Sequence, residues 1–482
     1  MSQKKSFYIT TTLPYVNSDP HIGFAMEIIR ADVVARAKLI QGYEVFFNTG
    51  TDEHGAKIFA AAVAEGKDVK EYVDGYEAKF RGLDELLGIL DDVHFIRTTD
   101  PHHISAAQEF WRRCNDNGYI YKKIYKAKYC VGCELQKTNS ELNEKGQCPL
   151  HPNNKIELID EENYFFQFSA FQKPLLELYE KNPNFVWPVS RYSEIKSFVA
   201  RGLEDFSISR LKSKMPWGVP VPGDDKHIMY VWFDALVNYI STLGWPENKE
   251  NFEKFWVNGT PMQYCGKDNL RQQSAMWQAM LMAAGLPPTH FIVINGFLTA
   301  EGGVKMSKSI GNVVSPYDLV KEYGMDAVRI FFLKEVSLFE DSPFTMERFK
   351  DAYNANLANG LGNLASRILT LSSKYLEKSP EIPKNLILRD FFDHLEKFDI
   401  KESVDYIWSE IAEIDKSIQE TEPFKLVKVN EKEGKELISN LVVQLFTIAN
   451  MLKPILPQTS DILKTLIKEN KKPETPLFPR KD

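Results

Sequence analysis

The pattern of apolar and polar residues along the first half of the chain alternates between strand-like and helix-like spacing. Residues 7–12 form a short apolar run typical of a buried strand, and residues 24–39 have the spacing of an amphipathic helix that Gly42 would close. Residues 43–49 predict the next strand. Further along, residues 228–233 and 291–294 predict strands, with a helix at 235–243 between them. This alternation predicts an α/β domain with a parallel sheet, divided by an insertion.

The pattern changes from about residue 345 onward, where strand signals become rare. Residues 354–374, 388–419 and 437–456 carry long helical spacing, and the last of these is strongly apolar. Several long helices in succession predict an all-helical C-terminal domain.

The first candidate for chemistry lies between the predicted strand at 7–12 and the helix at 24–39. There Pro20-His21-Ile22-Gly23 places a glycine where a backbone can approach a ligand closely, at a helix N-terminus whose N–H groups attract anions. His21 could then donate to a phosphate. A lone His-x-Gly more often packs in an ordinary turn.

A second segment, Lys305-Met306-Ser307-Lys308-Ser309, follows Gly302-Gly303. Two cations flanked by hydroxyls suit a loop that closes over the negative charge of a transferred phosphoryl group. Alone it could be a solvated surface loop. The two segments, in this order and on this framework, resemble the signature motifs of class I aminoacyl-tRNA synthetases. That resemblance implies ATP-dependent activation on a Rossmann-type parallel sheet.

Length and composition agree with a large globular protein. The chain has 482 residues, of which 43% are hydrophobic and 26% charged, so we expect about three domains with real cores. Neither an apolar leader nor an apolar run of membrane-spanning length is visible, which predicts a cytoplasmic protein without a membrane partner. The net charge of −7 gives no general sign of nucleic-acid binding, so RNA contacts must be local.

Three of the five cysteines stand in metal-ligand spacing. Cys130-x-x-Cys133 is followed, after fourteen residues, by Cys148-x-x-His151. Two tight pairs of this kind predict one tetrahedral Zn²⁺, and four protein ligands leave no position for water, so the ion would be structural. Cys114 and Cys265 lie outside the cluster and are most simply buried small hydrophobes.

Further segments narrow the resemblance to the methionyl-tRNA synthetase family. They cover essentially the whole chain and lie at 12–15, 50–55, 205–210, 217–220, 231–235, 266–268 and 363–367. Within 50–55, the Thr-Asp-Glu-His-Gly sequence is the most discriminating, because the leucine, isoleucine and valine enzymes differ there. The single Cys/Cys/Cys/His knuckle matches one zinc-bearing branch of the family.

The resemblance implies a role for individual residues. The Leu13 carbonyl and the Asp52 carboxylate would hold the methionine ammonium, and the thioether pocket would be walled by Tyr15, Trp232, Tyr239 and Trp277. ATP, together with Mg²⁺, would bind His21, Gly23, Gly266, Asp268, Lys305 and Lys308, of which His21, Lys305 and Lys308 would be catalytic. The anticodon of tRNA(Met) would be read by Asn359, Asn363, Arg367 and Phe424.

A division of the chain follows from these assignments. We expect the first half of the Rossmann catalytic domain at 1–115, an inserted connective domain with the zinc knuckle at 116–225, and the second half at 226–300. The lysine loop and a stem-contact region would occupy 301–345, and a helical anticodon-binding domain 346–482. No room is left for an appended dimerisation domain, so we expect a monomer.

The sequence departs from the family pattern at five positions. Phe24 replaces a second histidine near the phosphates, and the other departures, beside the methionine pocket, are Leu236, Gln272, Gln273 and Asn295. A phenyl ring cannot donate a hydrogen bond, so we expect weaker phosphate stabilisation. Two alternatives stay open, a class I synthetase for another amino acid such as cysteine and a non-catalytic tRNA-binding paralogue.

Overall fold

A six-stranded parallel sheet forms the centre of the computed structural model, which describes residues 5–130, 135–137, 142–149, 155–303, 313–383 and 389–482. Its strand order is β3-β2-β1-β12-β13-β7. The strands are β1 (Ser6–Thr10), β2 (Glu44–Thr51), β3 (His94–Arg97), β7 (Val186–Trp187), β12 (Thr260–Gly266) and β13 (Phe291–Asn295). Because the order reverses beside β1, the carboxyl ends of β1 and β12 border the crevice where sheets of this kind bind ligands.

The sheet is buried on both faces because alternate side chains enter two separate hydrophobic cores. Phe7 and Ile9 of β1 point into one core, whereas Tyr8 points into the other. Helix α1 (Ile22–Ile40) packs into the first core and α4 (Pro101–Asp116) into the second. The strand, helix and strand predicted between residues 7 and 49 are therefore confirmed.

The predicted strand at 228–233 is wrong in its second half. Strand β11 (Asp224–Met229) ends at Met229 and pairs antiparallel with β9 (Ser209–Leu211) and β10 (Pro220–Val221). Helix α7 (Val231–Ala235) begins two residues later and is followed by α8 (Asn238–Ser241). A short apolar run fits a buried helix as well as a strand, so the sequence could not distinguish the two.

The segment between the halves of the sheet carries its own antiparallel sheet, with strand order β5-β4-β6-β8. Its strands are β4 (Ile120–Cys130), β5 (Leu135–Lys137), β6 (Ile156–Phe166) and β8 (Phe206–Ser207). Between β6 and β8 the chain forms α5 (Gln172–Lys181), β7 and α6 (Val189–Ala200). Because β7 pairs with β13, part of the range 116–225 belongs to the parallel sheet and not to the insertion.

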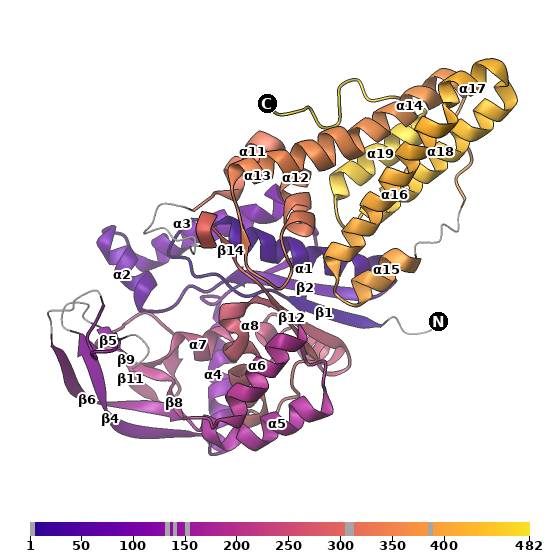
Figure 1. The fold of residues 1–482 in the computed structure, drawn as a ribbon. Coiled ribbons are helices and arrows are strands. Elements are labelled where there is room, and N and C mark those ends of the chain that lie inside the picture. Colours follow the sequence, from indigo (N-terminus) through magenta and orange to yellow (C-terminus); the bar gives the residue numbers. More distant parts are fainter. Residues whose placement is uncertain (1–4, 131–134, 138–141, 150–154, 304–312, 384–388) are drawn as a thin grey trace.

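The described residues from 346 onward form helices and connecting segments but no strand, as the sequence predicts. The helix at 346–375 is continuous but changes its winding, from α13 (Met346–Ala352) through a π-helical segment, η9 (Tyr353–Gly362), to α14 (Asn363–Tyr375). The first of the helices that follow lies beside α1, and Figure 1 shows the others extending away from the sheet. They are α15 (Arg389–Glu396), α16 (Ile400–Thr421), α17 (Pro423–Val429), α18 (Glu431–Leu452) and α19 (Pro457–Glu469).

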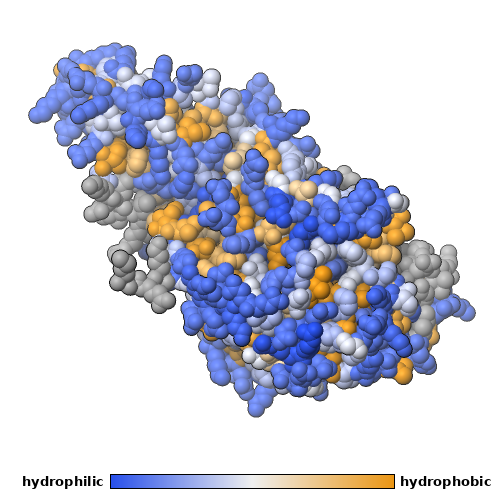
Figure 2. Space-filling view, turned by 180° about the vertical axis from the view of Figure 1, so that it is seen from behind, coloured by the Kyte–Doolittle hydropathy of each residue, from blue (hydrophilic) through white to orange (hydrophobic). Residues whose placement is uncertain are grey.

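The remaining helices and strands lie between the elements already described. Near β2 and β3 lie α2 (Ala56–Ala64) and α3 (Val69–Leu86), and around β12 lie α9 (Lys249–Asn251) and α10 (Trp277–Ala283). The chain then passes through β14 (Leu298–Thr299), α11 (Pro316–Tyr323), α12 (Met325–Ile330) and β15 (Ser342–Pro343). On the face shown in Figure 2, exposed hydrophobic side chains are scattered among hydrophilic ones.

One buried arginine fixes α12 against both parts of the molecule. Arg329 is fully buried and donates to the Asp32 carboxylate of α1 at 2.7 Å. It also donates to the carbonyls of Leu87, Pro454 and Ile455 at 3.1, 3.1 and 2.8 Å. A buried guanidinium needs such partners for each of its donors, so this contact fixes the approach of the helical part to the sheet.

Candidate functional site

The first predicted motif lies at the N-terminus of α1, directly beyond the carboxyl end of β1. His21 caps the helix, and its Nδ1 accepts a hydrogen bond from the Gly23 backbone N–H at 3.1 Å. A Cβ at position 23 would lie 2.9 Å from the His21 ring, so any larger residue would displace the imidazole from its capping position. The side chain of His21 is exposed at a helix end that favours anions, which suits a phosphate contact.

Three predicted methionine ligands come together where the chain leaves β1 and β2. Asp52 directly follows β2, and its backbone N–H donates to the Pro14 carbonyl at 3.0 Å while Val16 N–H donates to the Asp52 carbonyl at 3.3 Å. These bonds align Tyr15 beside Asp52, with Leu13 immediately before them. The Asp52 side chain is only 4% exposed, and its Oδ1 has no hydrogen-bond partner among the described residues.

A second buried carboxylate stands close to the first. Burial raises the pKa of Asp52 well above its usual value, and the neighbouring Asp234 carboxylate raises it further. Burial also raises the pKa of Asp234, although His54 Nδ1, 2.6 Å from Asp234 Oδ2, opposes that rise. Burial and Asp52 together raise the pKa of the Tyr15 hydroxyl. A cation at this position would relieve the repulsion between the carboxylates, so the site is electrostatically suited to an ammonium group.

The four predicted aromatic residues divide into two sets. Tyr239 and Trp277 are buried side by side, with ring centroids 5.9 Å apart, and Trp277 Nε1 has no partner among the described residues. Trp232 is 38% exposed and packs edge-on against Tyr230, 5.5 Å away. Tyr15 is half-buried next to Asp52. The predicted wall of the thioether pocket thus has a buried side, formed by Tyr239 and Trp277, and a more exposed side, formed by Trp232 and Tyr15.

Gly266 and Asp268 lie where β12 ends, next to an acidic residue that the sequence analysis did not single out. A Cβ at Gly266 would lie 2.9 Å from Asp268 Oδ1 and 3.9 Å from Glu27 Oε2. Glu27, on α1, accepts hydrogen bonds from the Thr12 N–H at 2.9 Å and from the Thr12 hydroxyl. Burial, and to a smaller extent Asp268, raises the pKa of Glu27 to about 7. Two carboxyl groups beside a bare backbone suit a ligand with hydroxyl groups, such as a ribose.

Glu27 can be recognised as a candidate site residue only from the residues that surround it in the folded protein. Fourteen of the nineteen residues of α1 are buried, so no polar face distinguishes one side of the helix from the other. Glu27 lies one turn beyond Gly23, which is the only sequence signal that connects it to the motif.

Four of the five residues that depart from the family pattern are buried in the protein. Phe24 is 8% exposed and packs edge-on against Phe80 of α3, with centroids 5.5 Å apart, so its ring belongs to the core. Leu236 is buried at the end of α7. Asn295 is buried and donates to the Gly296 carbonyl at 3.0 Å, whereas its Oδ1 has no partner among the described residues. Of the paired glutamines, Gln273 is buried and donates to the Tyr239 hydroxyl.

Several predicted site residues lie outside the described residues, namely Lys305, Lys308, Cys133 and His151. The other two predicted zinc ligands are described. Cys130 ends β4, Cys148 lies between β5 and β6 along the chain and outside both strands, and both residues are fully buried. Within the described ranges no three metal-binding side chains cluster together.

The predicted anticodon residues lie on the helical part. Asn359 of η9 and Asn363 of α14 are exposed, and Phe424 at the start of α17 is 40% exposed. Arg367 is partly exposed and forms an ion pair with Asp415 of α16. All four residues can be reached by a partner at the surface. A partner that binds the Arg367 side chain would have to compete with the Asp415 carboxylate.

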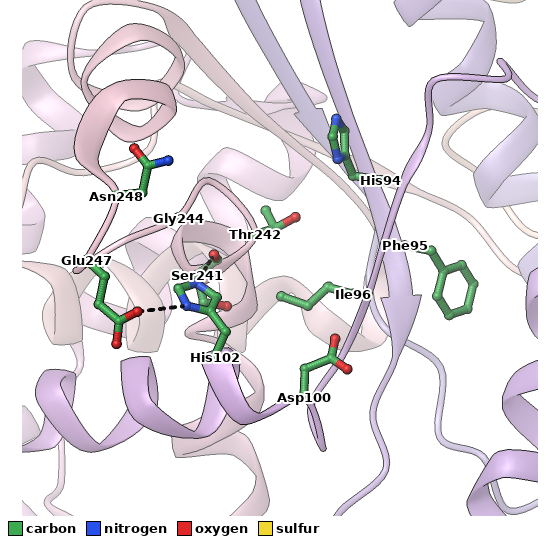
Figure 3. Close-up of a pocket in the computed structure, with 10 residues that line it drawn as sticks. All are labelled: His94, Phe95, Ile96, Asp100, His102, Ser241, Thr242, Gly244, Glu247 and Asn248. Atoms are coloured by element: carbon green, nitrogen blue, oxygen red, sulfur yellow. Dashed lines mark hydrogen bonds and ion pairs between the residues drawn. The ribbon is translucent and has the colours of Figure 1, made fainter.

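A cavity of about 380 Å³ lies apart from all of these residues. Figure 3 shows its lining, which comes from β3, the start of α4 and the segment after α8. His102 of α4 faces Glu247 across it, with 3.8 Å between Nδ1 and the carboxylate. None of the predicted site residues contributes to this cavity.

The class of the protein follows from the family match. The family model described as "tRNA synthetases class I (M)" matches residues 7–157 and 150–369, which include the parallel sheet and both sides of its crevice. The chain therefore belongs to the class I tRNA synthetases.

Its curated relatives narrow the class to one family. The chain is 41% identical over 477 residues to the methionine–tRNA ligase of Synechocystis sp., covering 95% of this chain and 89% of that one. It is 39% identical to the enzyme of Thermotoga maritima, covering 97% and 76%. The solved Mycobacterium tuberculosis methionyl-tRNA synthetase in complex with methionyl-adenylate superposes with a TM-score of 0.88 at 33% identity, covering 99% and 100%. This chain belongs to the methionyl-tRNA synthetases.

Proposed function

We propose that this chain activates L-methionine with ATP to methionyl-adenylate and transfers the methionyl group to the 3′-terminal adenosine of tRNA(Met), releasing pyrophosphate and then AMP. The observation that carries the proposal is the buried Asp52 carboxylate, whose Oδ1 lacks a partner among the described residues, beside Leu13 and Tyr15. An unpaired buried carboxylate is costly unless a ligand completes it, and the α-ammonium of an amino acid would do so. The methionyl-adenylate bound by the M. tuberculosis relative supports this choice of ligand.

The arrangement of the groups fits an in-line attack by the methionine carboxylate on the α-phosphate. Asp52 would hold the ammonium on one side of the crevice, and Glu27 and Asp268 would hold the ribose on the other. His21 and the α1 N-terminus would face the phosphates between them. Catalysis then consists of positioning and charge stabilisation, so no side chain needs to act as a covalent nucleophile.

Further cations would complete the phosphate site. Lys305 and Lys308 are proposed to contact the leaving pyrophosphate, and Mg²⁺ bound with ATP supplies additional positive charge when present. The exposed His21 imidazole and the α1 N-terminus are suited to the anionic part of such a complex.

Amino-acid-dependent exchange of pyrophosphate into ATP tests the proposal. Exchange should require methionine and should not proceed with cysteine, which would be the substrate under the closest enzymatic alternative. Absence of exchange with every amino acid would instead support a non-catalytic tRNA-binding paralogue.

We also propose one structural Zn²⁺ held by Cys130, Cys133, Cys148 and His151. The full burial of the Cys130 and Cys148 thiols, in a segment where many side chains are exposed, fits a metal-bound pair. Metal analysis of freshly purified protein should give one zinc per chain, and Cys130→Ser should lose it. Cys114→Ser, which changes a buried thiol outside the cluster, should keep it.

The remaining proposals concern the whole protein. Residues 346–482 are proposed to bind the anticodon, and the antiparallel sheet within 116–225 is proposed to form the zinc-bearing connective domain. Among the described residues no helix is long and apolar enough to span a bilayer. Cytoplasmic location and a monomeric state stay predictions, the second of which sedimentation equilibrium would check.

A further inference from the structure

Arg30 of α1 is a buried cation whose backbone acceptors all lie in one other segment of the chain. It stands three residues after Glu27 and is fully buried. Within the described ranges no carboxylate pairs with Arg30. Its guanidinium donates at 3.0–3.4 Å to four backbone carbonyls, those of Phe332, Val336, Ser337 and Leu338. A buried guanidinium is costly without partners, so these carbonyls and Arg30 hold one another in place.

The acceptors surround the end of one helix. Helix α12 continues into a π-helical turn, η8 (Phe331–Glu335). The last carbonyls of a helix have no partner within it and form the negative end of its dipole, so a guanidinium beside them is favoured. Arg30 therefore joins α1, which bears His21 and Glu27, to the chain that follows η8.

The chain after η8 forms a compact turn, residues 336–342, which packs against the end of a strand of the central sheet. The Leu338 carbonyl accepts from the Gly296 N–H at 3.1 Å as well as from Arg30. Gly296 directly follows β13. A Cβ at Gly296 would lie 2.3 Å from the Glu340 carbonyl oxygen, so any side chain there would displace the turn.

The Asp341 carboxylate of the same turn reaches the nucleotide side of the crevice. Its Oδ1 accepts from the Phe297 N–H at 3.0 Å, and its Oδ2 accepts from the Lys267 ammonium at 2.7 Å. That ammonium also lies over the Phe297 ring, 4.7 Å from its centroid. Lys267 stands between Gly266 and Asp268, the two predicted ATP ligands at the end of β12. The turn is thus bonded to the segment that carries both ligands.

Phe297 completes the path, because its ring borders the bare backbone of Gly266. A Cβ at Gly266 would lie 3.4 Å from this ring and 3.9 Å from Glu27 Oε2. The Phe297 carbonyl accepts from the Ser342 N–H at 2.9 Å, which is a further bond to the turn. The ring, Glu27 and Asp268 therefore border the place where the adenosine of ATP is proposed to lie.

We propose that Arg30 is a positioning residue for ATP, which holds the turn 336–342 and thereby sets the place of Lys267 and Phe297 beside Gly266. The inference rests on the proposed activation of methionine and concerns only the nucleotide side of that site. Arg30 acts through the turn and not by contact with the nucleotide. Loss of Arg30 should consequently weaken the binding of ATP and spare that of methionine.

Arg30→Met gives the direct test, because it removes the guanidinium but keeps a long side chain in the core. We expect the KM for ATP in methionine-dependent pyrophosphate exchange to rise about tenfold, with the KM for methionine within about twofold of the parent. The dissociation constant of ATP, measured by calorimetry without methionine, should rise by the same factor. A merely structural role would lower the unfolding temperature without changing either ATP constant.

Arg329→Met is the matched control. Arg329 is equally buried and donates to the Asp32 carboxylate and to backbone carbonyls, but none of its acceptors within the described ranges belongs to the turn 336–342. Its loss should lower the unfolding temperature at least as much as the loss of Arg30. Both ATP constants should keep their parental values.

Asp341→Ala tests the other end of the path. The Asp341 side chain is 42% exposed, so the variant should fold, and the KM for ATP should rise about fivefold. Glu340→Ala, at the exposed neighbouring position, should keep the parental value. If Arg30 and Asp341 act through one path, the double variant should raise the ATP KM no more than the larger single change does. Multiplied effects would show that the two residues act independently.

The outcomes separate the two proposals. A parent that binds ATP but shows no methionine-dependent exchange would end the proposed function, and the ATP dissociation constants would still test Arg30. Parental ATP constants in folded Arg30→Met, or equal rises for ATP and methionine, would overturn the inference. Should Arg30→Met fail to fold, Arg30→Lys decides, because one ammonium keeps the charge but cannot reach all four carbonyls. An unchanged ATP dissociation constant in both Arg30→Lys and Asp341→Ala would then overturn the inference.

Discussion

At the scale of single residues, the site is a set of buried charges that lack part of their partners. Burial and the Asp234 carboxylate raise the pKa of Asp52, and burial raises the pKa of Asp234, whereas His54 opposes both rises, through its backbone N–H at Asp52 and through its ring at Asp234. An ammonium group would favour the ionised form of Asp52, so amino-acid binding should be linked to loss of a proton.

This linkage gives the first prediction, for Asp52→Asn. Methionine should bind the parent more tightly as pH rises through the elevated pKa of Asp52, and the variant should lose most of that dependence. Loss of the buried charge pair costs about 2 kcal/mol or more, so the KM for methionine should rise roughly thirtyfold while the KM for ATP changes little. Pyrophosphate exchange measured across pH checks both statements.

Asp326→Asn, at a buried aspartate outside the crevice, is the control and should leave the methionine KM unchanged. An equal rise of the KM in Asp326→Asn would contradict the assignment of Asp52.

Glu27 gives the second prediction, because its folded pKa of about 7 lies above its ordinary value of 4.5. A carboxyl that holds its proton more tightly when folded stabilises the protein below pH 4.5 and loses that contribution as pH rises through 7. The loss is about 3 kcal/mol over this window. Glu27→Gln cannot ionise, so its stability should change less between these pH values.

Urea unfolding midpoints at a series of pH values provide the measurement. The parent midpoint should fall between pH 4.5 and 7 relative to Glu27→Gln, in which the amide oxygen can still accept from Thr12. The exposed Glu65→Gln serves as a control and should follow the parent curve. Parallel curves for the parent and Glu27→Gln would show that the carboxyl does not titrate in this window.

At the scale of elements, the predictions succeeded where the signal was local. The strand and helix on either side of His21 could be placed because an apolar run, a turn and a helix stop follow one another within 45 residues. Strand β12 was missed because Gln263 interrupts its apolar run. The partners that make this glutamine acceptable in the core, Gln273 and Thr289, come from other elements. Glu27 escaped notice for a similar reason, since its role depends on Gly266 from a distant strand.

The third prediction concerns the anchoring of α12 by Arg329. Arg329→Met would leave the buried Asp32 carboxylate with Arg36 as its remaining cation and three backbone carbonyls without their donor, and the loss of such a buried ion pair costs about 3 kcal/mol. We expect a clear drop in thermal stability with methionine-dependent exchange preserved at low temperature. Lys70→Met, which breaks the exposed pair with Asp74, should cost less than about 1 kcal/mol. Equal effects of the two changes would mean that Arg329 is not an anchor.

At the scale of the whole molecule, the candidate adenylate site and the candidate anticodon surface lie in different parts of the fold. The crevice is at the ends of β1 and β12, whereas Asn363 and Arg367 belong to α14, which Figure 1 shows running outward with α16, α18 and α19. The sequence could indicate both sites because their residues stand in several short motifs, each of which is recognisable by itself. It could not indicate that Arg367 is engaged by Asp415, which comes from another helix.

This separation gives the last prediction. Asn363→Ala and Arg367→Ala should lower the rate of tRNA aminoacylation at least tenfold, as expected when one or two base contacts worth about 1–3 kcal/mol are lost. Methionine-dependent pyrophosphate exchange should remain within about twofold of the parent, because neither residue touches the crevice. Ser373→Ala, at an exposed position near the end of α14 and beyond Arg367, is the control for helix integrity. Asp415→Ala distinguishes recognition from support of the fold. Removing the ion-pair partner should leave aminoacylation intact or improve it if Arg367 contacts RNA, and should impair both activities if the pair serves only to hold α14 against α16.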